Sequence, residues 1–395
     1  AVFCLSPFAV VMYFHHLHFY IEDAAVWKDW FEGMLAFSPA EIDRSETAYS
    51  EIPNENHDEN HDAIALVQDG IEIRLSTPKH SHQVRRYLNQ HPPGLADIAF
   101  ASDKFDVVLA HALRQGARLL APVTLLGNGQ RQCQLNGWAD LRHTLVEVSA
   151  DWIKTHQPSD RPAYSRKHKL STETLEAPSS EAPSSLLSFI DHVVINVPQG
   201  ELQAAIAWYQ SVFDLQLGQS FEINTAHSGL CSQVLLHPEG TLQLPINEPS
   251  SANSQVQEFL NHNRGAGVQH VALRSADAVS AIAHFRQQGL KLLNVPKTYY
   301  ENLPKRANCP LKDLSTISQQ QLLLDWNKDG EKGMLLQTFT EPIFAEPTFF
   351  FEIIERSYYS ESGQFKLAQG FGEGNFQALF EAIERAQLER GSLKP

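Results

Sequence analysis

Three side chains in the second half of the sequence could together hold a metal ion. His192 lies in the strand-like run FIDHVVINV, and His270 occupies the corresponding place in VQHVAL. Glu352 interrupts the aromatic and aliphatic run TFFFEIIER, where a buried carboxylate needs a partner because desolvating a lone charge is costly. Two imidazoles and one carboxylate form the facial triad of non-haem iron(II) oxygenases, which leaves positions open for substrate and dioxygen.

Each of these residues has a simpler explanation when it is taken alone. A single histidine in a strand is more often a structural residue than a ligand, and Glu352 could pair with Arg356. The two histidines recur at matching points of a repeated segment, so we predict a metal centre. The first half contains a similar set, His16, Asp97 and Glu147, in which an aspartate replaces the second histidine. We therefore expect no working metal site there.

The elements that must position these residues follow one plan four times. Segments that begin at Tyr13, Gly94, Phe189 and Gly267 each contain a strand-like run, a polar break and a helix with apolar spacing, and further strand-like runs follow. This pattern predicts an α+β fold of two domains. In each domain, paired βαβββ modules would form a curved, barrel-like open sheet with helices outside, and its hollow could hold a metal.

Two polar, low-complexity stretches divide the chain. EAPSSEAPSS at 176–185 has the composition of a linker, and ENHDENHD at 55–62 is interpreted as a surface loop rather than a metal-binding tract, despite His57 and His61. We predict a non-catalytic N-terminal domain at 12–153, a linker at 154–187 and a catalytic domain at 188–395. Residues 1–11 precede Met12 and the first strand-like run, and we expect them to be an extension upstream of the functional start.

The composition excludes several classes of protein. A formal net charge of −15 argues against nucleic-acid and anionic-membrane partners, which attract basic patches. The 4 cysteines lie far apart without a CxxC motif, so neither a disulfide framework nor a thiolate zinc site is indicated, and a reducing, cytoplasmic compartment fits best. The apolar N-terminal run is too short to span a bilayer and lacks the basic region of a signal peptide.

A resemblance to a known family joins these observations. The second half, from Phe189 to Leu393, resembles the 4-hydroxyphenylpyruvate dioxygenases of the vicinal oxygen chelate superfamily. The matching motifs are FIDHVV, WYQSVF, PINEP, SQVQEFL, GAGVQHVAL, VPKTYYENL, LLQTF, FFFEIIER and GFGEGNFQALFEAIE. The first half resembles the family's non-catalytic domain more loosely, in YFHHLHFYIEDA and HPPGLADIAF.

The resemblance implies a reaction and a site. Such an enzyme converts 4-hydroxyphenylpyruvate and O2 to homogentisate and CO2 by oxidative decarboxylation, ring hydroxylation and side-chain migration. His192, His270 and Glu352 match the ligands of one Fe(II) per chain. The matching substrate-binding residues are Ser232, Asn247, Gln255, Gln269, Gln337, Phe339, Phe350, Phe371 and Phe376. Among these, Gln269, Gln337 and Asn247 are expected to take part in catalysis, and the family forms homo-oligomers, dimers or tetramers.

The end of the chain is predicted to be an amphipathic helix. Phe376, Leu379, Phe380 and Ile383 have i, i+3, i+4 and i+7 spacing. The resemblance implies that this helix closes over the active site. GFGEGN is not interpreted as a phosphate-binding loop, because it follows no predicted strand and turn of the required kind.

Other functions stay open at this point. Hydroxymandelate synthase shares the triad and the substrate but hydroxylates the benzylic carbon, and the aromatic wall at Phe339, Phe350, Phe371 and Phe376 favours attack on the ring. A non-enzymatic vicinal oxygen chelate protein could bind an aromatic ligand without turnover, although the complete triad argues against it. Homogentisate would enter either tyrosine catabolism or plastoquinone and tocopherol biosynthesis.

Overall fold

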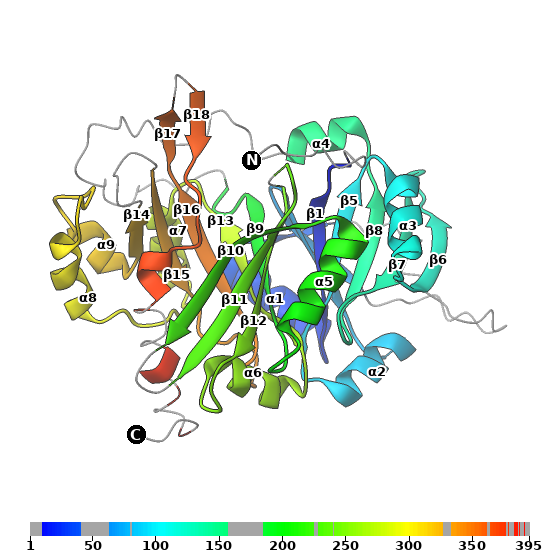
Figure 1. Cartoon of the computed structure of the whole chain (residues 1–395), viewed down its shortest axis with the longest axis horizontal. Coiled ribbons are helices and arrows are strands. Elements are labelled where there is room, and N and C mark those ends of the chain that lie inside the picture. The colour runs from blue at the N-terminus through cyan, green and yellow to red at the C-terminus, as the bar shows by residue number, and fades with distance from the viewer. Residues whose placement is uncertain are drawn as a thin grey trace.

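Two eight-stranded sheets organise the protein, and both follow the same topology (Figure 1). The computed structural model describes residues 10–40, 63–79, 81–156, 185–224, 228–239, 241–326, 333–361 and 364–376, together with residues 378, 383–385, 387 and 391. The acidic stretch at 55–62, with His57 and His61, lies outside the described residues, as does most of the predicted linker.

The first sheet has the order β2-β3-β4-β1-β5-β8-β7-β6. Its strands are β1 (Tyr13–Tyr20), β2 (Ser38–Ala40), β3 (Ile64–Gln68), β4 (Ile71–Ser76), β5 (Gly94–Ser102), β6 (Leu119–Leu125), β7 (Arg131–Asn136) and β8 (Arg142–Glu147). The second sheet has the order β10-β11-β12-β9-β13-β16-β15-β14. Its strands are β9 (Phe189–Asn196), β10 (Gln216–Asn224), β11 (Gly229–Leu236), β12 (Gln243–Pro249), β13 (Gly267–Arg274), β14 (Leu323–Trp326), β15 (Met334–Phe339) and β16 (Phe350–Arg356).

The helices of the two halves correspond in part, since the first three of each half occupy equivalent places. They are α1 (Ala24–Leu35), α2 (His82–Gln90), α3 (Phe105–Arg114), α4 (Ala150–His156), α5 (Leu202–Phe213), α6 (Gln255–Asn263), α7 (Ala278–Gln287), α8 (Lys297–Asn302) and α9 (Ser315–Gln320). A two-stranded ribbon, β17 (Tyr358–Glu361) and β18 (Gln364–Leu367), precedes the short 3-10 turn η3 (Glu373–Asn375). The predicted α+β fold of paired βαβββ modules is confirmed, because α1, α3, α5 and α7 each follow one strand and precede three.

Local chemistry explains where these helices begin and end. Asp23 caps α1 by accepting hydrogen bonds from two backbone N–H groups of its first turn, and the helix ends at Ala36 in the left-handed conformation. Asp277 caps α7 in the same way through the N–H of Ser280. The predicted domain boundary at residue 153 falls inside α4.

Aromatic side chains join the two halves. Phe31 of α1 packs against Phe351 of β16, with ring centroids 6.0 Å apart, and Phe100 of β5 packs against Phe213 of α5 at 5.2 Å. His143 of β8 is hydrogen-bonded to the Tyr209 hydroxyl of α5 at 3.0 Å. The helices α1 and α5 therefore lie between one sheet and the other.

Two expectations from composition can be compared with the structure. Within the part of the chain that is described, no helix is both long and apolar enough to cross a membrane. Cys133, Cys231 and Cys309 carry free thiols, and Cys4 lies outside the described residues.

Candidate metal centre

The register of three neighbouring strands brings the predicted ligands together. Ala272 of β13 lies opposite His192 of β9 on one side and opposite Glu352 of β16 on the other. Residues that face each other in a sheet project from the same face, and so do residues two apart along one strand. His192, Glu352 and His270 therefore share one face, and the small side chain of Ala272 stands between them.

The three groups converge within coordination reach of one ion. Nε2 of His192 lies 3.2 Å from Oε2 of Glu352, and Nε2 of His270 lies 3.6 Å from the same oxygen. One ligand atom from each residue lies within 4.8 Å of the others. His192 and Glu352 are both 2% exposed. Two imidazole nitrogens and one carboxylate oxygen form the donor set of a facial triad, so the residues fit a divalent iron ion.

The charges of this group complement a cation. Burial raises the pKa of Glu352, but His192 and His270 outweigh burial and lower that pKa to about 2. Burial lowers the pKa of His192, but Glu352 and Asp191 outweigh it and raise that pKa to about 9. Burial keeps the pKa of His270 below its ordinary value despite Glu352. Without a metal the site thus holds a carboxylate and a protonated His192, and a metal ion would displace that proton.

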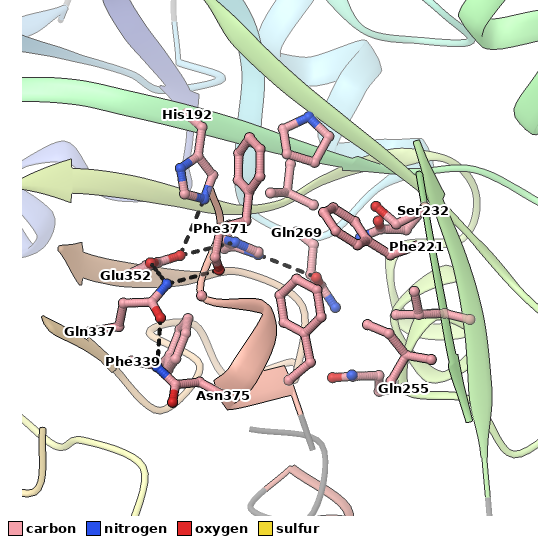
Figure 2. Close-up of a pocket in the computed structure, with 18 of the residues that line it drawn as sticks. His192, Phe221, Ser232, Gln255, Gln269, Gln337, Phe339, Glu352, Phe371 and Asn375 are labelled. Carbon is pink, nitrogen blue, oxygen red and sulfur yellow. Dashed lines mark hydrogen bonds and ion pairs between the residues drawn. The ribbon is translucent and has the colours of Figure 1, made fainter. Parts of the chain in front are cut away.

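These residues form one wall of a cavity that holds about 700 Å³ of empty space including its mouth. All of the predicted substrate-binding residues line it, namely Ser232, Asn247, Gln255, Gln269, Gln337, Phe339, Phe350, Phe371 and Phe376. In Figure 2, Ser232 and Gln255 lie on the side of the cavity away from Glu352 and Gln337. The cavity thus has a charged end and a polar, uncharged end.

Gln337 is hydrogen-bonded to three partners around the site (Figure 2). Its Nε2 donates to Oε1 of Glu352 at 2.8 Å and to the carbonyl of Phe371 at 3.0 Å. Its Oε1 accepts from Nδ2 of Asn375 at 2.9 Å, and Asn375 accepts in turn from the hydroxyl of Tyr299 at 2.7 Å. The amide thereby links a predicted metal ligand to the segment 371–375, which lines the cavity.

The other predicted polar residues come from the sheet and from α6. Ser232 and Asn247 lie opposite each other on β11 and β12, and Asn247 donates to Oδ1 of Asn196 at 3.2 Å. Gln255 is the first residue of α6. Oε1 of Gln269 lies 3.3 Å from Nδ1 of His270, so this amide contacts a predicted ligand.

Aromatic rings cover the predicted ligands. His270 stacks on Phe350, with centroids 4.8 Å apart and planes at 16°, and Phe339 meets the edge of the same imidazole. Phe371 meets His192 edge to face at 5.2 Å. This packing fixes the orientation of both imidazoles and makes the surroundings of the site apolar.

Sequence reasoning missed three residues that belong to the site. Phe221 on β10 contacts Phe371 and Phe376, and the alternating apolar pair Phe221 and Ile223 was the available signal in a strand that is mostly exposed. Asn375 lies in the same GFGEGN motif as the predicted residue Phe371, but neither its type nor its place in the motif indicated a role. Asp191 precedes His192 directly and accepts from its Nδ1 at 3.0 Å.

Arg356 does not contact Glu352 as an ion-pair partner. Its guanidinium pairs with Asp191, with Nη2 of Arg356 2.7 Å from Oδ1. The simpler explanation of Glu352 as the partner of Arg356 is therefore wrong.

The C-terminal helix is described only in part. Residues 376, 378, 383–385 and 387 are helical, whereas Leu379 and Phe380 lie outside the described residues. Phe376 and Ile383 line the cavity, and the carboxylate of Glu384 accepts a hydrogen bond from the Ser228 hydroxyl at 2.6 Å.

The corresponding face of the first sheet differs from the prediction. Asp97 lies opposite Arg142 in the register of β5 and β8, just as His270 lies opposite Phe350 in the register of β13 and β16. Glu352 lies two residues after Phe350, so its counterpart lies two residues after Arg142. That counterpart is Thr144 and not Glu147. The correspondence of Glu147 with Glu352 is therefore wrong, and Glu147 pairs instead with Arg131 at 2.7 Å.

Hydrogen-bond donors occupy the carboxylate of Asp97. The side chains of Thr144 and Gln134 both donate to its Oδ2 at 2.6 Å. A different trio on this sheet, His15, His16 and Glu72, has ligand atoms close together, but Nε of Arg74 lies 2.6 Å from Glu72 and its positive charge opposes a metal cation.

Comparisons with known proteins agree with this geometry. Residues 189–307 match the model of the Glyoxalase/Bleomycin resistance protein/Dioxygenase superfamily. The 4-hydroxyphenylpyruvate dioxygenase of Danio rerio is 32% identical, over 96% of this chain and 92% of that protein. The 4-hydroxyphenylpyruvate dioxygenase of Legionella pneumophila (strain Corby) is 32% identical, over 91% of this chain and 95% of that protein.

Solved structures share the fold. A mutant of 4-hydroxymandelate synthase from Streptomyces coelicolor superposes with a TM-score of 0.73 at 23% identity, covering 95% of this chain and 98% of that one. A xylose isomerase-like TIM barrel/4-hydroxyphenylpyruvate dioxygenase fusion protein superposes with a TM-score of 0.69 at 24% identity, covering 96% of this chain and 53% of that one.

Proposed function

The chain belongs to the 4-hydroxyphenylpyruvate dioxygenase family, and from that premise we propose that it converts 4-hydroxyphenylpyruvate and O2 to homogentisate and CO2 with one Fe(II) per chain. The observation that carries the proposal is the convergence of His192, His270 and Glu352 at one wall of a cavity whose lining is mainly apolar. Three protein ligands on one face would leave the cavity side of the ion for substrate and dioxygen.

Iron bound there would supply the activation of dioxygen that oxidative decarboxylation and ring hydroxylation require. The protein's own part is to place the substrate. We propose that the 2-oxo acid end of the substrate lies at the metal, beside Gln269, whose amide contacts His270. The aromatic ring would then lie among Phe339, Phe350 and Phe371, whose side chains can make offset or edge contacts with it.

The length of the cavity orients the phenol. With the 2-oxo acid at the charged end, the phenolic hydroxyl would point to the opposite side, where Ser232, Asn247 and Gln255 offer hydrogen-bonding groups. A hydroxyl and amides can both donate and accept, which suits a phenol. Gln337 would hold the carboxylate of Glu352 and the backbone of Phe371 in fixed positions through its hydrogen bonds. This would help to keep water away from the reacting carbon atoms.

We extend the proposal to the organisation of the chain. The halves at 12–153 and 188–395 would act as a non-catalytic and a catalytic domain, since the proposed metal ligands and all residues that line the cavity belong to the second half. The free thiols support a reducing, cytoplasmic compartment. A homo-oligomer, dimer or tetramer, is proposed from family membership alone.

The test is to identify the product. Protein loaded with Fe(II) under anaerobic conditions is incubated with 4-hydroxyphenylpyruvate in air. The products are then separated by chromatography and identified by mass spectrometry. We expect homogentisate, with one CO2 released and one O2 consumed for each molecule formed. Formation of hydroxymandelate would contradict ring hydroxylation and show that the protein catalyses the benzylic reaction. Absence of O2 uptake at full iron occupancy would show that the protein binds its ligand without turnover.

A further inference from the structure

A buried ion-pair cluster lies directly behind His192. Asp191 is 3% exposed, and its Oδ1 lies 3.0 Å from Nδ1 of His192. Arg356 donates to both carboxylate oxygens of Asp191, through Nη2 to Oδ1 at 2.7 Å and through Nε to Oδ2 at 2.8 Å. Arg274 donates to Oδ2 through Nη2 at 2.6 Å and through Nε at 3.0 Å. One carboxylate thus receives two guanidinium groups and an imidazole N–H.

This carboxylate determines how His192 presents its ring. An acceptor at Nδ1 keeps the hydrogen on that nitrogen, so the lone pair of the neutral imidazole is at Nε2, which faces Glu352. The two guanidinium groups fix the carboxylate in place because a planar fork allows little rotation. Asp191 is therefore suited to position His192 for a metal ion.

Arg356 also contacts the segment 368–371, which leads into the wall of the cavity. Its Nη1 donates to the carbonyl of Ala368 at 3.0 Å and to the carbonyl of Gly370 at 2.8 Å. The next residue, Phe371, meets His192 edge to face and lines the cavity. One guanidinium, 6% exposed, thus connects the support of a predicted metal ligand with the backbone of this segment.

Arg274 provides a natural comparison. It is the other guanidinium that contacts Asp191, but within the described part of the chain its side chain donates hydrogen bonds to Asp191 alone. Removal of Arg274 perturbs the carboxylate, whereas removal of Arg356 perturbs the carboxylate and the segment together. The two effects can therefore be separated.

We propose that Arg356 is a positioning residue that couples metal binding to closure of the 368–371 segment, through Asp191 and His192 on one side and the Ala368 and Gly370 carbonyls on the other. The inference rests on the proposed function, because it requires a metal at His192. The ion holds His192 in the orientation that Asp191 supports, and Arg356 transmits this order to the backbone that carries Phe371. Coupling of this kind is reciprocal, so closure of the segment also strengthens metal binding.

The experiment compares the unaltered protein with Arg356→Met and Arg274→Met, using Co(II) as the probe metal. The Co(II) dissociation constant is measured by visible absorption, and amide hydrogen exchange of residues 364–376 is measured with and without Co(II). Loss of a residue that supports a metal ligand weakens metal binding roughly 10- to 100-fold, and we expect this in both variants. In the unaltered protein and in Arg274→Met, Co(II) should slow exchange of the segment; in Arg356→Met this protection should be reduced.

Equal protection by Co(II) in the two variants would overturn the coupling, and so would an unchanged dissociation constant in Arg356→Met. Arg356→Lys keeps the charge without the fork and, if Arg356→Met does not fold, should show the same reduced protection. Failure of the unaltered protein to bind Co(II) would instead refute the metal site on which the proposed function depends.

Discussion

His192 and Glu352 lie 3.2 Å apart, Nε2 to Oε2, on strands that are not neighbours. Strand β13 runs between β9 and β16, and Ala272 faces both residues in the register. The two side chains reach each other across Ala272 because its methyl group occupies little of the space between them. His270, two residues earlier on β13, approaches the same carboxylate at 3.6 Å. Strand register thus sets the geometry of the triad.

Removal of one ligand should abolish metal-dependent activity without unfolding the protein. We expect His270→Ala to lose Fe(II) binding and turnover, because two ligands hold a divalent ion far more weakly than three. Glu352 keeps its ion pair with His192 in this variant, so no buried charge is left alone. Iron content, O2 uptake and the thermal midpoint measure the three effects.

Matched substitutions at other histidines serve as controls. His284→Ala on α7 and His57→Ala in the acidic stretch at 55–62 should leave iron content and turnover unchanged. Retention of activity in His270→Ala would refute its assignment as a ligand.

A methyl group at Gly372 should displace Gln337. The backbone there has φ +77°, and an added Cβ would lie 1.8 Å from Oε1 of Gln337, so the amide cannot keep its place. We expect Gly372→Ala to weaken iron binding and turnover by roughly tenfold or more, as for other residues that support a ligand.

Gly289→Ala separates this contact from backbone strain. Gly289 has φ +92° with nothing within 4 Å of an added Cβ, so its substitution costs about 1–2 kcal/mol of stability and no activity. Equal loss of iron affinity in both variants would show that the contact with Gln337 is unimportant.

Substrate pairs should distinguish the two ends of the cavity. In Gln255→Met, we expect the preference for 4-hydroxyphenylpyruvate over phenylpyruvate to fall, since a phenol partner is worth about 0.5–1.5 kcal/mol or more when buried. In Gln269→Met, kcat/KM should fall by a similar factor for both substrates, because this amide lies beside His270. The same loss of preference in both variants would contradict the proposed orientation.

Buried histidines of the first sheet should make the protein sensitive to acid. Burial lowers the pKa of His143 to about 4, despite the nearby charge of Asp97. In the unfolded state the pKa of this histidine is near 6.5, so the unfolded state binds the proton more tightly than the folded state. The free energy of unfolding therefore falls as the pH drops from about 6.5 to about 4. Each such histidine contributes a slope of up to about 1.4 kcal/mol per pH unit.

Urea unfolding between pH 4.5 and pH 8 measures this slope in the unaltered protein and in His143→Gln. We expect the variant to be less stable at pH 8, because the imidazole stacks on Phe100 and is hydrogen-bonded to Tyr209, and to have a shallower slope below pH 6.5. An unchanged slope would show that His143 binds a proton equally well in the folded and unfolded states, which would contradict the lowered pKa.

The fold could be predicted from the sequence because the periodic pattern repeats four times. Strand-like runs such as IEIRLS and FIDHVVIN appear as β4 and β9, and each is followed or preceded by polar breaks where the chain turns. Strand β10 gave a weak signal because most of its residues are exposed, so Phe221 was missed. Edge strands of this kind lack the buried, alternating side chains on which pattern recognition depends.

The triad could be predicted from residue type and repetition, but its supporting contacts could not. Asp191 and His192 are adjacent in sequence, whereas Arg274 and Arg356 approach Asp191 from other strands. Pairings of this kind depend on three-dimensional register. The register also explains the error at Glu147, because counting along the sequence does not reveal that Thr144 lies beside Asp97.

Anomalous diffraction at the iron absorption edge tests the central claim most directly. Crystals grown with Fe(II) under anaerobic conditions should show one strong iron peak per chain, within about 2.0–2.2 Å of Nε2 of His192, Nε2 of His270 and an oxygen of Glu352. A peak bound by other residues, or none at this triad in protein that turns over 4-hydroxyphenylpyruvate, would contradict the account.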